Sequence, residues 1–424
     1  MDEIQQEILG ERVSRVAGNL PRVEEDLPSR WSRRTSAIWA AIRAITFFLG
    51  RRNPLAQPAN PEQHIVWLFD NIAYRPVHPY HNEPQSWQVE VVSCVFVDGR
   101  KDLSRYVAAV ADAIGLDGKV GLDEVTRQRM AYRLRPFVYS IAPARTMTLE
   151  IPMVHGTVQK QELGPTNRHG VISQTLRTDS RHDVSDGTTI TSYLAGWGRK
   201  VSMDTIFATP EGWPVISDID DSIKYTKTSE ATGVLRTTFA EEPKPIEGMP
   251  ESYAHIHKQL RPAWIYLSAS PYNLYEYLRE FLRSYYIPGT LILRENSWMG
   301  LGGFLNSYTQ GTQAYKMDRI DKVHSWFPQR KIICVGDSTQ SDPEIYAGMY
   351  KKYPGWIHAI LIRKVTNIPH MEKKNSDERF RKAFDGVPEG VWKVFERTEE
   401  LYELVDGLKT RQPTGSAAGV HCEN

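Results

Sequence analysis

The apolar and polar positions follow one pattern in the first half of the chain and another in the second. Between 63 and 205, short strand-type runs are separated by Gly, Pro, Asn and Asp, and helical spacing is confined to 101–136. The strands expected in this part are 64–69, 88–97, 137–141, 146–154, 170–176 and 188–194. From 206 to 408, apolar runs alternate with stretches of helical spacing. The strands expected there are 215–218, 264–268, 291–293, 331–335 and 357–362, and the expected helices are 253–260, 274–286, 316–326 and 342–352. This alternation predicts an α/β doubly wound parallel sheet, preceded by a β-rich module with some helices.

The two ends of the chain show neither pattern. Residues 1–62 are expected to form a tail, and 409–424, rich in Gly, Thr, Pro, Ser and Ala, are expected to be disordered. Within the first tail, arginines flank an apolar centre over 30–52. Such a basic amphipathic segment can lie on an anionic membrane surface or dock on the protein's own core, and the sequence leaves both interpretations open.

Composition sets limits on the class of protein. The chain is 424 residues long, 41% hydrophobic and 24% charged, which suits two domains with tails and a sizeable core. A net charge of +1 gives no overall attraction to nucleic acid. The three cysteines lie far apart, which disfavours a zinc site or a disulfide framework and favours a reducing, cytoplasmic compartment. The acidic residues near the N-terminus disfavour a signal peptide. A helix that spans a membrane needs about 18 consecutive apolar residues, and no run in the sequence is that long.

Carboxylates follow two of the expected strands. Asp218, Asp220 and Asp221 lie at the end of one apolar run, and Asp337 and Asp342 follow another. The carboxyl ends of parallel strands meet at one edge of a sheet, where open α/β sheets bind their ligands, so one shared acidic site is predicted. Such a site requires a hard divalent cation, and Mg²⁺ is the usual choice beside a phosphate. For three acids alone, a solvated acidic turn is the alternative.

Together with the two acidic segments, two further residues complete a set of four motifs. An apolar strand ends in Ser268, and Lys316 lies at the start of an expected helix. In this order the four resemble the motifs of the haloacid dehalogenase superfamily of phosphotransferases. The surrounding sequence resembles more closely the catalytic domain of the fungal actin-patch-protein type of Mg²⁺-dependent phosphatidate phosphatase, over 206–365. The strings that carry this resemblance are VISDIDDSIK, SASPY, LREFL, YKMDRI and GDSTQSDPEIY.

The resemblance implies a haloacid dehalogenase, Rossmann-like fold without a large cap, and a phosphoric monoester hydrolase. Asp218 would be the nucleophile that forms an aspartyl-phosphate, and Asp220 would protonate the leaving alkoxide and then activate water. Ser268 and Lys316 would bind the phosphoryl oxygens. The Mg²⁺ ligands would be Asp218, the backbone carbonyl of Asp220, Asp337 and Asp342.

Some of these assignments have competitors in the sequence. Ser270 competes with Ser268 for the phosphate, and Lys322 and Lys331 are less well placed alternatives to Lys316. Asp342 also suits the N-cap of the helix that follows it. The arginines between Arg127 and Arg135 are expected on a solvated helix face rather than in a site.

The substrate comes only from the resemblance, which implies hydrolysis of phosphatidate to diacylglycerol. The short stretch 223–263 leaves no room for a large cap. The Gly-rich, apolar segment 298–305 would suit a lipid beside a membrane, or would fold onto the sheet as a surface loop. A cytoplasmic protein with peripheral membrane contact through 30–52 and 298–305 is expected. A phosphatase for a soluble phosphomonoester and a membrane-associated scaffold with a vestigial site are the alternatives.

Overall fold

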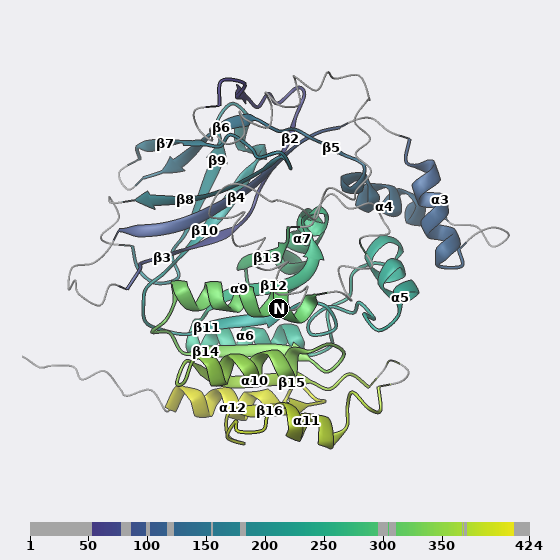
Figure 1. Ribbon diagram of the computed structural model, residues 1–424, viewed down its shortest axis with the longest axis vertical. Helices are drawn as coiled ribbons and strands as arrows, with labels where there is room; N and C mark the ends of the chain where they lie inside the picture. Colours follow the sequence, from purple (N-terminus) through teal and green to yellow (C-terminus); the bar gives the residue numbers. More distant parts are fainter. Residues whose placement is uncertain are drawn as a thin grey trace, which may run out of the picture.

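The computed structural model describes residues 53–410, except 78–85, 99–101, 117–122, 154–155, 179–183, 296–303, 305–310, 367 and 369–370. The basic segment 30–52 therefore lies outside the described residues, and so does 298–305 apart from Phe304. The described chain forms two sheets, one above the other in Figure 1. None of the helices in these ranges is long and apolar enough to cross a bilayer.

The first sheet is β-rich and mostly antiparallel. Its strand order is β1-β6-β9-β10-β3-β4-β2, with β5 and β8 paired to β4 and β7 paired to β6. Only β10–β3 and β1–β6 pair in parallel within the described ranges. The strands are β1 (Gln57–Pro58), β2 (Ile65–Leu68), β3 (Asn71–Tyr74), β4 (Trp87–Val97), β5 (Ser140–Ile141), β6 (Arg145–Pro152), β7 (Val158–Leu163), β8 (Val171–Thr178), β9 (Thr189–Leu194) and β10 (Ser202–Ala208).

The second sheet is parallel throughout, in the order β13-β12-β11-β14-β15-β16. The predicted parallel α/β sheet and the β-rich module before it are both present. The strands are β11 (Pro214–Asp218), β12 (Ala263–Pro271), β13 (Thr290–Arg294), β14 (Ile332–Asp337), β15 (Ile357–Arg363) and β16 (Trp392–Phe395). The last of these, β16, was not expected from the pattern.

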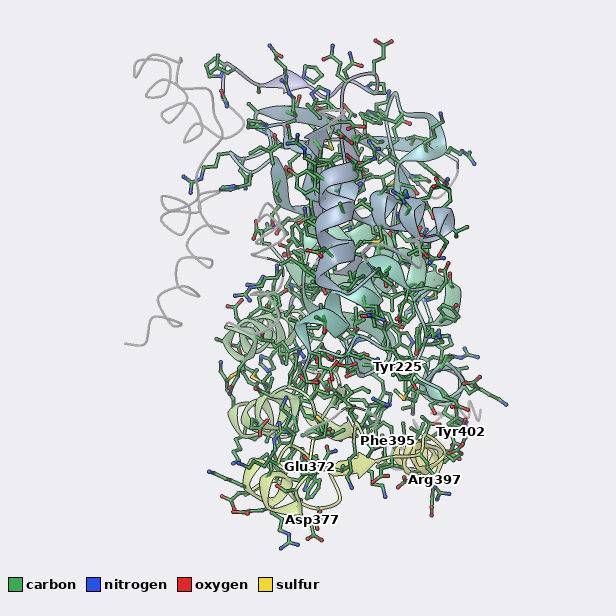
Figure 2. All side chains as sticks on the ribbon, turned by 90° about the vertical axis from the view of Figure 1, so that its right-hand side faces the viewer. Tyr225, Glu372, Asp377, Phe395, Arg397 and Tyr402 are labelled. Carbon is green, nitrogen blue, oxygen red and sulfur yellow. The ribbon has the colours of Figure 1, made fainter. Side chains whose placement is uncertain are left out.

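Helices cover both faces of the parallel sheet because its strands are apolar on both sides. Val215 packs in a core with α6, α7 and α12, whereas the next residue, Ile216, packs in another core with α9 and α10. In Figure 2 the end of β16, near Phe395, lies between α11 and α12. The helices are α3 (Ser104–Ala113), α4 (Glu124–Leu134), α5 (Ala231–Leu235), α6 (Met249–Leu260), α7 (Tyr275–Tyr285), α9 (Thr312–Trp326), α10 (Asp342–Lys352), α11 (Asp377–Ala383) and α12 (Glu400–Thr410).

The two sheets are joined through α7. Arg279 donates two hydrogen bonds to Asp70 of the first sheet, at 2.7 and 2.6 Å, and Phe69 stacks on Tyr275 with ring centroids 3.8 Å apart. Since α7 follows β12 directly, the first sheet packs against the element next to Ser268 and Ser270.

Two local expectations were wrong. Arg133 does not lie on a solvated face: it is buried, and its guanidinium donates to the carbonyls of Thr238 and Glu241 at 3.0 and 2.6 Å. The expected strand 137–141 is reduced to Ser140–Ile141, because Pro136 lies in a 3₁₀ turn formed by Arg135–Phe137.

Candidate active site

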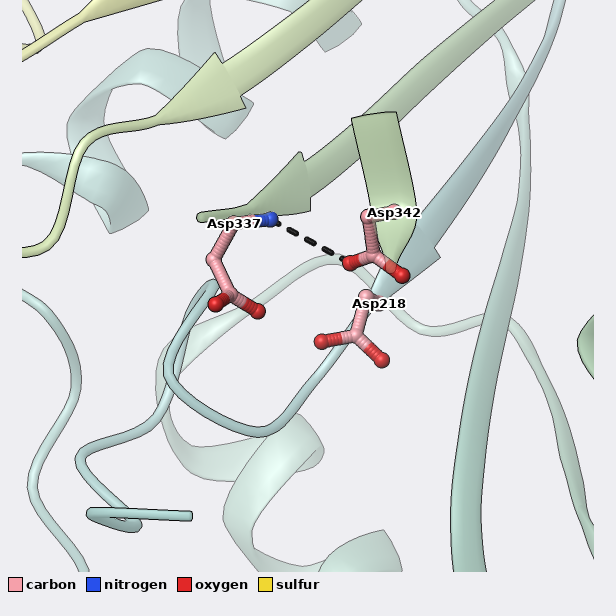
Figure 3. Close-up of side chains that lie close together, drawn as sticks. All are labelled: Asp218, Asp337 and Asp342. Atoms are coloured by element: carbon pink, nitrogen blue, oxygen red, sulfur yellow. Dashed lines mark hydrogen bonds between the residues drawn. The ribbon is translucent and has the colours of Figure 1, made fainter. Parts of the chain in front are cut away.

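The predicted residues meet at the carboxyl edge of the parallel sheet. Asp218 ends β11 and Asp337 ends β14, and these two strands are neighbours. Asp342 opens α10, directly after the β14 loop, and its carboxylate faces the other two in Figure 3. One oxygen from each of the three carboxylates lies within 4.8 Å of the others, and all three side chains are buried.

Lys316 lies inside this acidic cluster. Its Nζ is 2.7 Å from Asp218 Oδ1 and 2.6 Å from Asp342 Oδ1, and the side chain is buried. Because α9 begins at Thr312, Lys316 is in the second turn of the helix rather than at its start. The two competing lysines lie elsewhere: Lys322 pairs with Glu90 of the first sheet, and Lys331 precedes β14 at the opposite edge.

Burial dominates the electrostatics of the cluster. It raises the pKa of Asp337 to about 7, with Asp342 and Asp221 adding to the effect. Burial also raises the pKa of Asp218 well above its ordinary value, against the opposing effect of Lys316. For Lys316 burial acts to lower the pKa, but Asp218 and Asp342 outweigh it and raise the pKa. A protonated lysine therefore faces three carboxylates that it only partly neutralises.

Gly336 allows the Asp342 carboxylate to lie close to the backbone of β14. A Cβ atom at Gly336 would lie 2.5 Å from Asp342 Oδ2, so any other residue would displace that carboxylate. The backbone N–H of Asp337 donates to the same oxygen at 3.2 Å. Asp342 does not act as an N-cap, since it lies within α10 and Ser341 takes the cap position.

The hydrogen-bond partners of Asp220 are hydroxyl groups. Its Oδ1 accepts a hydrogen bond from Thr226 Oγ1 at 2.8 Å, and its Oδ2 accepts from Ser268 Oγ at 2.7 Å and Ser270 Oγ at 3.3 Å. In this conformation Ser268, the predicted phosphate ligand, therefore contacts the predicted acid–base residue. The carboxylate of Asp220 is not part of the three-acid cluster found among the described residues.

Asp221 holds the loop that follows β11 and carries Thr226. Its backbone has a φ of 62°, which aspartate tolerates better than most residues. Its carboxylate accepts hydrogen bonds from the backbone N–H groups of Thr226, Lys227 and Thr228 at 2.7 to 3.0 Å. The third acid of the motif is therefore a loop anchor.

Ser222 bridges two of the acids. Its hydroxyl lies 3.0 Å from Asp218 Oδ2 and 3.2 Å from Asp337 Oδ2. Thr339 donates through both its N–H and its hydroxyl to Asp337 Oδ1. Neither residue was predicted in the site, although each lies within a quoted motif string.

The donor set fits a divalent metal ion. Three carboxylates within one coordination sphere supply oxygen ligands alone, as Mg²⁺ and Ca²⁺ prefer. Burial raises the pKa of Asp218 and Asp337 despite the nearby Lys316, so a bound cation would favour the charged forms of these two carboxylates.

The segment that holds the candidate site is similar to a known family. Residues 213–364 match the family model described as phosphatidate phosphatase APP1, catalytic domain. The predicted family resemblance is thereby confirmed for this segment. Every residue of the candidate site lies within it, whereas the whole first sheet lies outside.

Two curated relatives match over similar lengths of the chain. The phosphatidate phosphatase APP1 of Saccharomyces cerevisiae is 30% identical over 164 residues, which are 38% of this chain and 27% of the relative. An uncharacterized protein of Schizosaccharomyces pombe is 28% identical over 159 residues, 36% of this chain and 25% of the relative. The match thus spans about a quarter of the length of either relative.

Proposed function

We propose that this chain is a Mg²⁺-dependent phosphatidate phosphatase, and that its parallel sheet is of the haloacid dehalogenase type without a large cap. The reaction would convert phosphatidate and water to diacylglycerol and phosphate. The match over 213–364 and the name of the Saccharomyces cerevisiae relative support the substrate. The site geometry supports the class of reaction.

In the first step, a carboxylate oxygen of Asp218 attacks phosphorus. The bond between phosphorus and the glycerol oxygen breaks, and Asp220 gives its proton to that oxygen, so that diacylglycerol leaves as an alcohol. In the second step, Asp220 takes a proton from a water molecule whose oxygen attacks the aspartyl-phosphate. The bond from phosphorus to Asp218 then breaks and phosphate leaves.

The remaining residues would hold the phosphoryl group and its charge. Asp218, Asp337 and Asp342, with the backbone carbonyl of Asp220, would hold Mg²⁺, which when bound neutralises phosphoryl charge. Lys316 Nζ, 2.7 Å from the attacking carboxylate, would bind a phosphoryl oxygen. Ser268 would exchange its contact with Asp220 for another phosphoryl oxygen, with Ser270 as the alternative.

One observation carries the proposal. Asp218 and Asp220 leave the same strand end, but one carboxylate contacts a buried ammonium and the other contacts only hydroxyl groups and a more distant lysine. A nucleophile has to be an anion, whereas an acid–base residue has to change its charge. The ammonium favours the anionic form of Asp218, against the burial that raises the pKa of that carboxyl group, and the hydroxyl groups around Asp220 can donate or accept in either of its charge states.

Phosphate release with Mg²⁺ tests the proposal, using phosphatidate in mixed micelles and a soluble aryl phosphate. Asp218→Asn should retain less than about 1% of the wild-type rate, because an amide cannot attack phosphorus. Asp321→Asn, the same change at a site paired with Lys352, is the control. A rate above that limit would overturn the assignment of Asp218.

The wild-type substrate preference decides between the functions. Preference for the lipid supports the proposed substrate. Activity on the soluble ester alone keeps the mechanism and replaces the substrate by a soluble phosphomonoester. Activity on neither substrate would contradict the proposed enzymatic function and favour the membrane-associated scaffold.

We further propose a cytoplasmic protein that contacts membranes peripherally through 30–52 and 298–305. Phe304 of the second segment is buried between Phe137 and Phe239, with ring centroids 5.7 and 5.3 Å away. This residue would anchor the segment to the protein rather than insert into lipid. Equal liposome binding by the chain with and without residues 1–52 would overturn the contribution of 30–52.

A further inference from the structure

Lys224 is a buried lysine without a role in the mechanism above. It follows the motif that holds Asp218 and Asp220, and it is 1% exposed. Its Nζ lies 2.8 Å from Thr226 Oγ1, 3.9 Å from Asp220 Oδ1, and 5.7 Å from the centre of the Tyr277 ring. Lysine is rarely buried without a partner, so its position beside the acid–base residue requires an explanation.

The contact with Thr226 determines where the threonine hydroxyl points. An ammonium group can only donate hydrogen bonds, so Lys224 occupies an acceptor position on Thr226 Oγ1. The single hydroxyl hydrogen is then free for Asp220 Oδ1, 2.8 Å away. The other acceptor within reach, the carbonyl of Lys224, is farther away at 3.4 Å. The lysine therefore selects the hydroxyl orientation that holds Asp220.

The two oxygens of Asp220 are held from different elements. Thr226, in the loop after β11, holds Oδ1, whereas Ser268 and Ser270 of β12 contact Oδ2. If Ser268 turns to the phosphoryl group during the reaction, Oδ2 loses its shorter contact, keeps only the 3.3 Å contact with Ser270, and becomes more available for proton transfer. The 2.8 Å contact with Thr226, which Lys224 supports, would then be the shortest one that orients the carboxylate.

We propose that Lys224 and Thr226 are positioning residues for Asp220: Lys224 orients the Thr226 hydroxyl, and that hydroxyl holds Oδ1 so that Oδ2 faces the leaving group. This inference rests on the proposed function, because it assigns a role in the proton transfer of that reaction. It applies to this chain's own loop, 223–228, and requires no contact between Lys224 and substrate.

The test uses two substrates that differ in how much they need a proton. They are phosphatidate and its analogue with sulfur as the bridging atom, or phenyl and 4-nitrophenyl phosphate if only soluble esters are turned over. Thiolate and nitrophenolate leave without protonation, whereas alkoxide and phenolate do not. Since kcat/KM reports the first chemical step, the ratio of kcat/KM between the two substrates measures proton donation to the leaving group.

Thr226→Val removes the hydroxyl at nearly constant volume, and Thr226→Ser restores it. We expect Thr226→Val to lower kcat/KM about 10- to 100-fold for the poor leaving group and less than about threefold for the good one. Lys224→Met should act in the same direction, and Thr226→Ser should remain close to wild type. Thr238→Val is the matched control, because Thr238 is equally buried and its hydroxyl has no hydrogen-bond partner in the described chain.

The possible results distinguish the positioning role from the proposed function. Equal losses of kcat/KM on both substrates, or no loss, would overturn the positioning role while leaving the proposed function intact. A Thr226→Ser variant as impaired on the poor leaving group as Thr226→Val would overturn it as well. Wild-type protein without activity on phosphatidate or either soluble ester would overturn the proposed function, and this inference with it.

Discussion

Asp218 and Asp220 lie two positions apart at the end of β11, and their carboxylates have different neighbours. Asp218 contacts the ammonium of Lys316 and belongs to the three-acid cluster, whereas Asp220 accepts hydrogen bonds from Thr226, Ser268 and Ser270. An ammonium can only donate, so it favours the charged form of Asp218 against the burial that raises the pKa of that group, but a hydroxyl can donate or accept. Hydroxyl neighbours can therefore serve a carboxyl group in both of its protonation states.

This difference shows how one strand end can supply two kinds of carboxylate. Side chains at i and i+2 diverge after the strand because Asp221 and the loop it anchors turn Asp220 towards β12. On the cation side, Lys316 contacts Asp218 directly. On the hydroxyl side, the direct hydrogen-bond partners of Asp220 are hydroxyl groups, and the Nζ of Lys224 is farther away at 3.9 Å. Changes on the cation side should mainly alter stability and metal response, whereas changes on the hydroxyl side should have smaller effects on folding.

The largest stability effect is expected from Lys316→Met. The change leaves three buried carboxylates without a cation, so the metal-free protein should lose about 3–5 kcal/mol in free energy of unfolding. Urea unfolding with and without Mg²⁺ measures this, and Mg²⁺ should recover part of the loss because it supplies the missing positive charge.

Lys352→Met is the control for that experiment, since Lys352 pairs with Asp321 at the surface and is 46% exposed. Such surface pairs contribute about 0–1 kcal/mol. A Lys316→Met protein as stable as the Lys352→Met protein in the absence of Mg²⁺ would contradict the picture of an acidic cluster held together by its lysine.

A pH dependence should follow from Asp337. Its pKa is raised to about 7 in the folded protein, from about 4 when unfolded. The folded state therefore keeps a proton that the unfolded state releases, and this contribution is fully present below pH 4 and lost as the pH rises through 7. Metal-free protein should lose up to about 4 kcal/mol across that interval through this group.

Unfolding free energies at pH 5, 6 and 7.5 (about the interval in which the proton is released) measure this slope. Asp337→Asn should flatten it, whereas Asp385→Asn, at an exposed position, should leave it unchanged. Saturating Mg²⁺ should reverse the trend, because the cation binds the deprotonated carboxylates. A slope that is the same in wild type and Asp337→Asn would contradict the assignment of the raised pKa to Asp337.

The acidic cluster could be predicted because Asp218 and Asp337 end neighbouring strands and Asp342 follows one of these strands after a short loop. Parallel strands bring their carboxyl ends to one edge whatever the intervening chain does, so Asp218, Asp337 and Asp342 could be expected together. Lys316 came from the motif resemblance rather than from the hydrophobic pattern. The catalytic and metal-binding roles of these residues stay predictions.

Lys224 and Arg133 could not be predicted, because distant segments bury them. The ring of Tyr277 in α7 lies 5.7 Å from Lys224 Nζ and 4.6 Å from the Arg133 guanidinium. The two carbonyls to which Arg133 donates are 105 and 108 positions away in sequence. Local pattern cannot show that a charged side chain on a loop or helix will be covered in this way. The short strands β3 and β10 were missed for a similar reason, since their parallel pairing joins remote segments.

The smallest effect should separate Ser268 from Ser270 on the hydroxyl side. Ser268 Oγ donates to Asp220 at 2.7 Å and also accepts the backbone N–H of Ser270 at 3.0 Å, so Ser268→Ala removes two buried contacts. It should cost about 1.5–3 kcal/mol in free energy of unfolding. Ser270→Ala removes a longer contact of 3.3 Å and should cost less than about 1 kcal/mol.

The same order is expected for loss of kcat/KM, with the larger loss in Ser268→Ala, because the shorter contact belongs to the residue assigned to the phosphoryl group. The reverse order in both measurements would transfer that assignment to Ser270 and leave Asp220 with a different partner in the resting site.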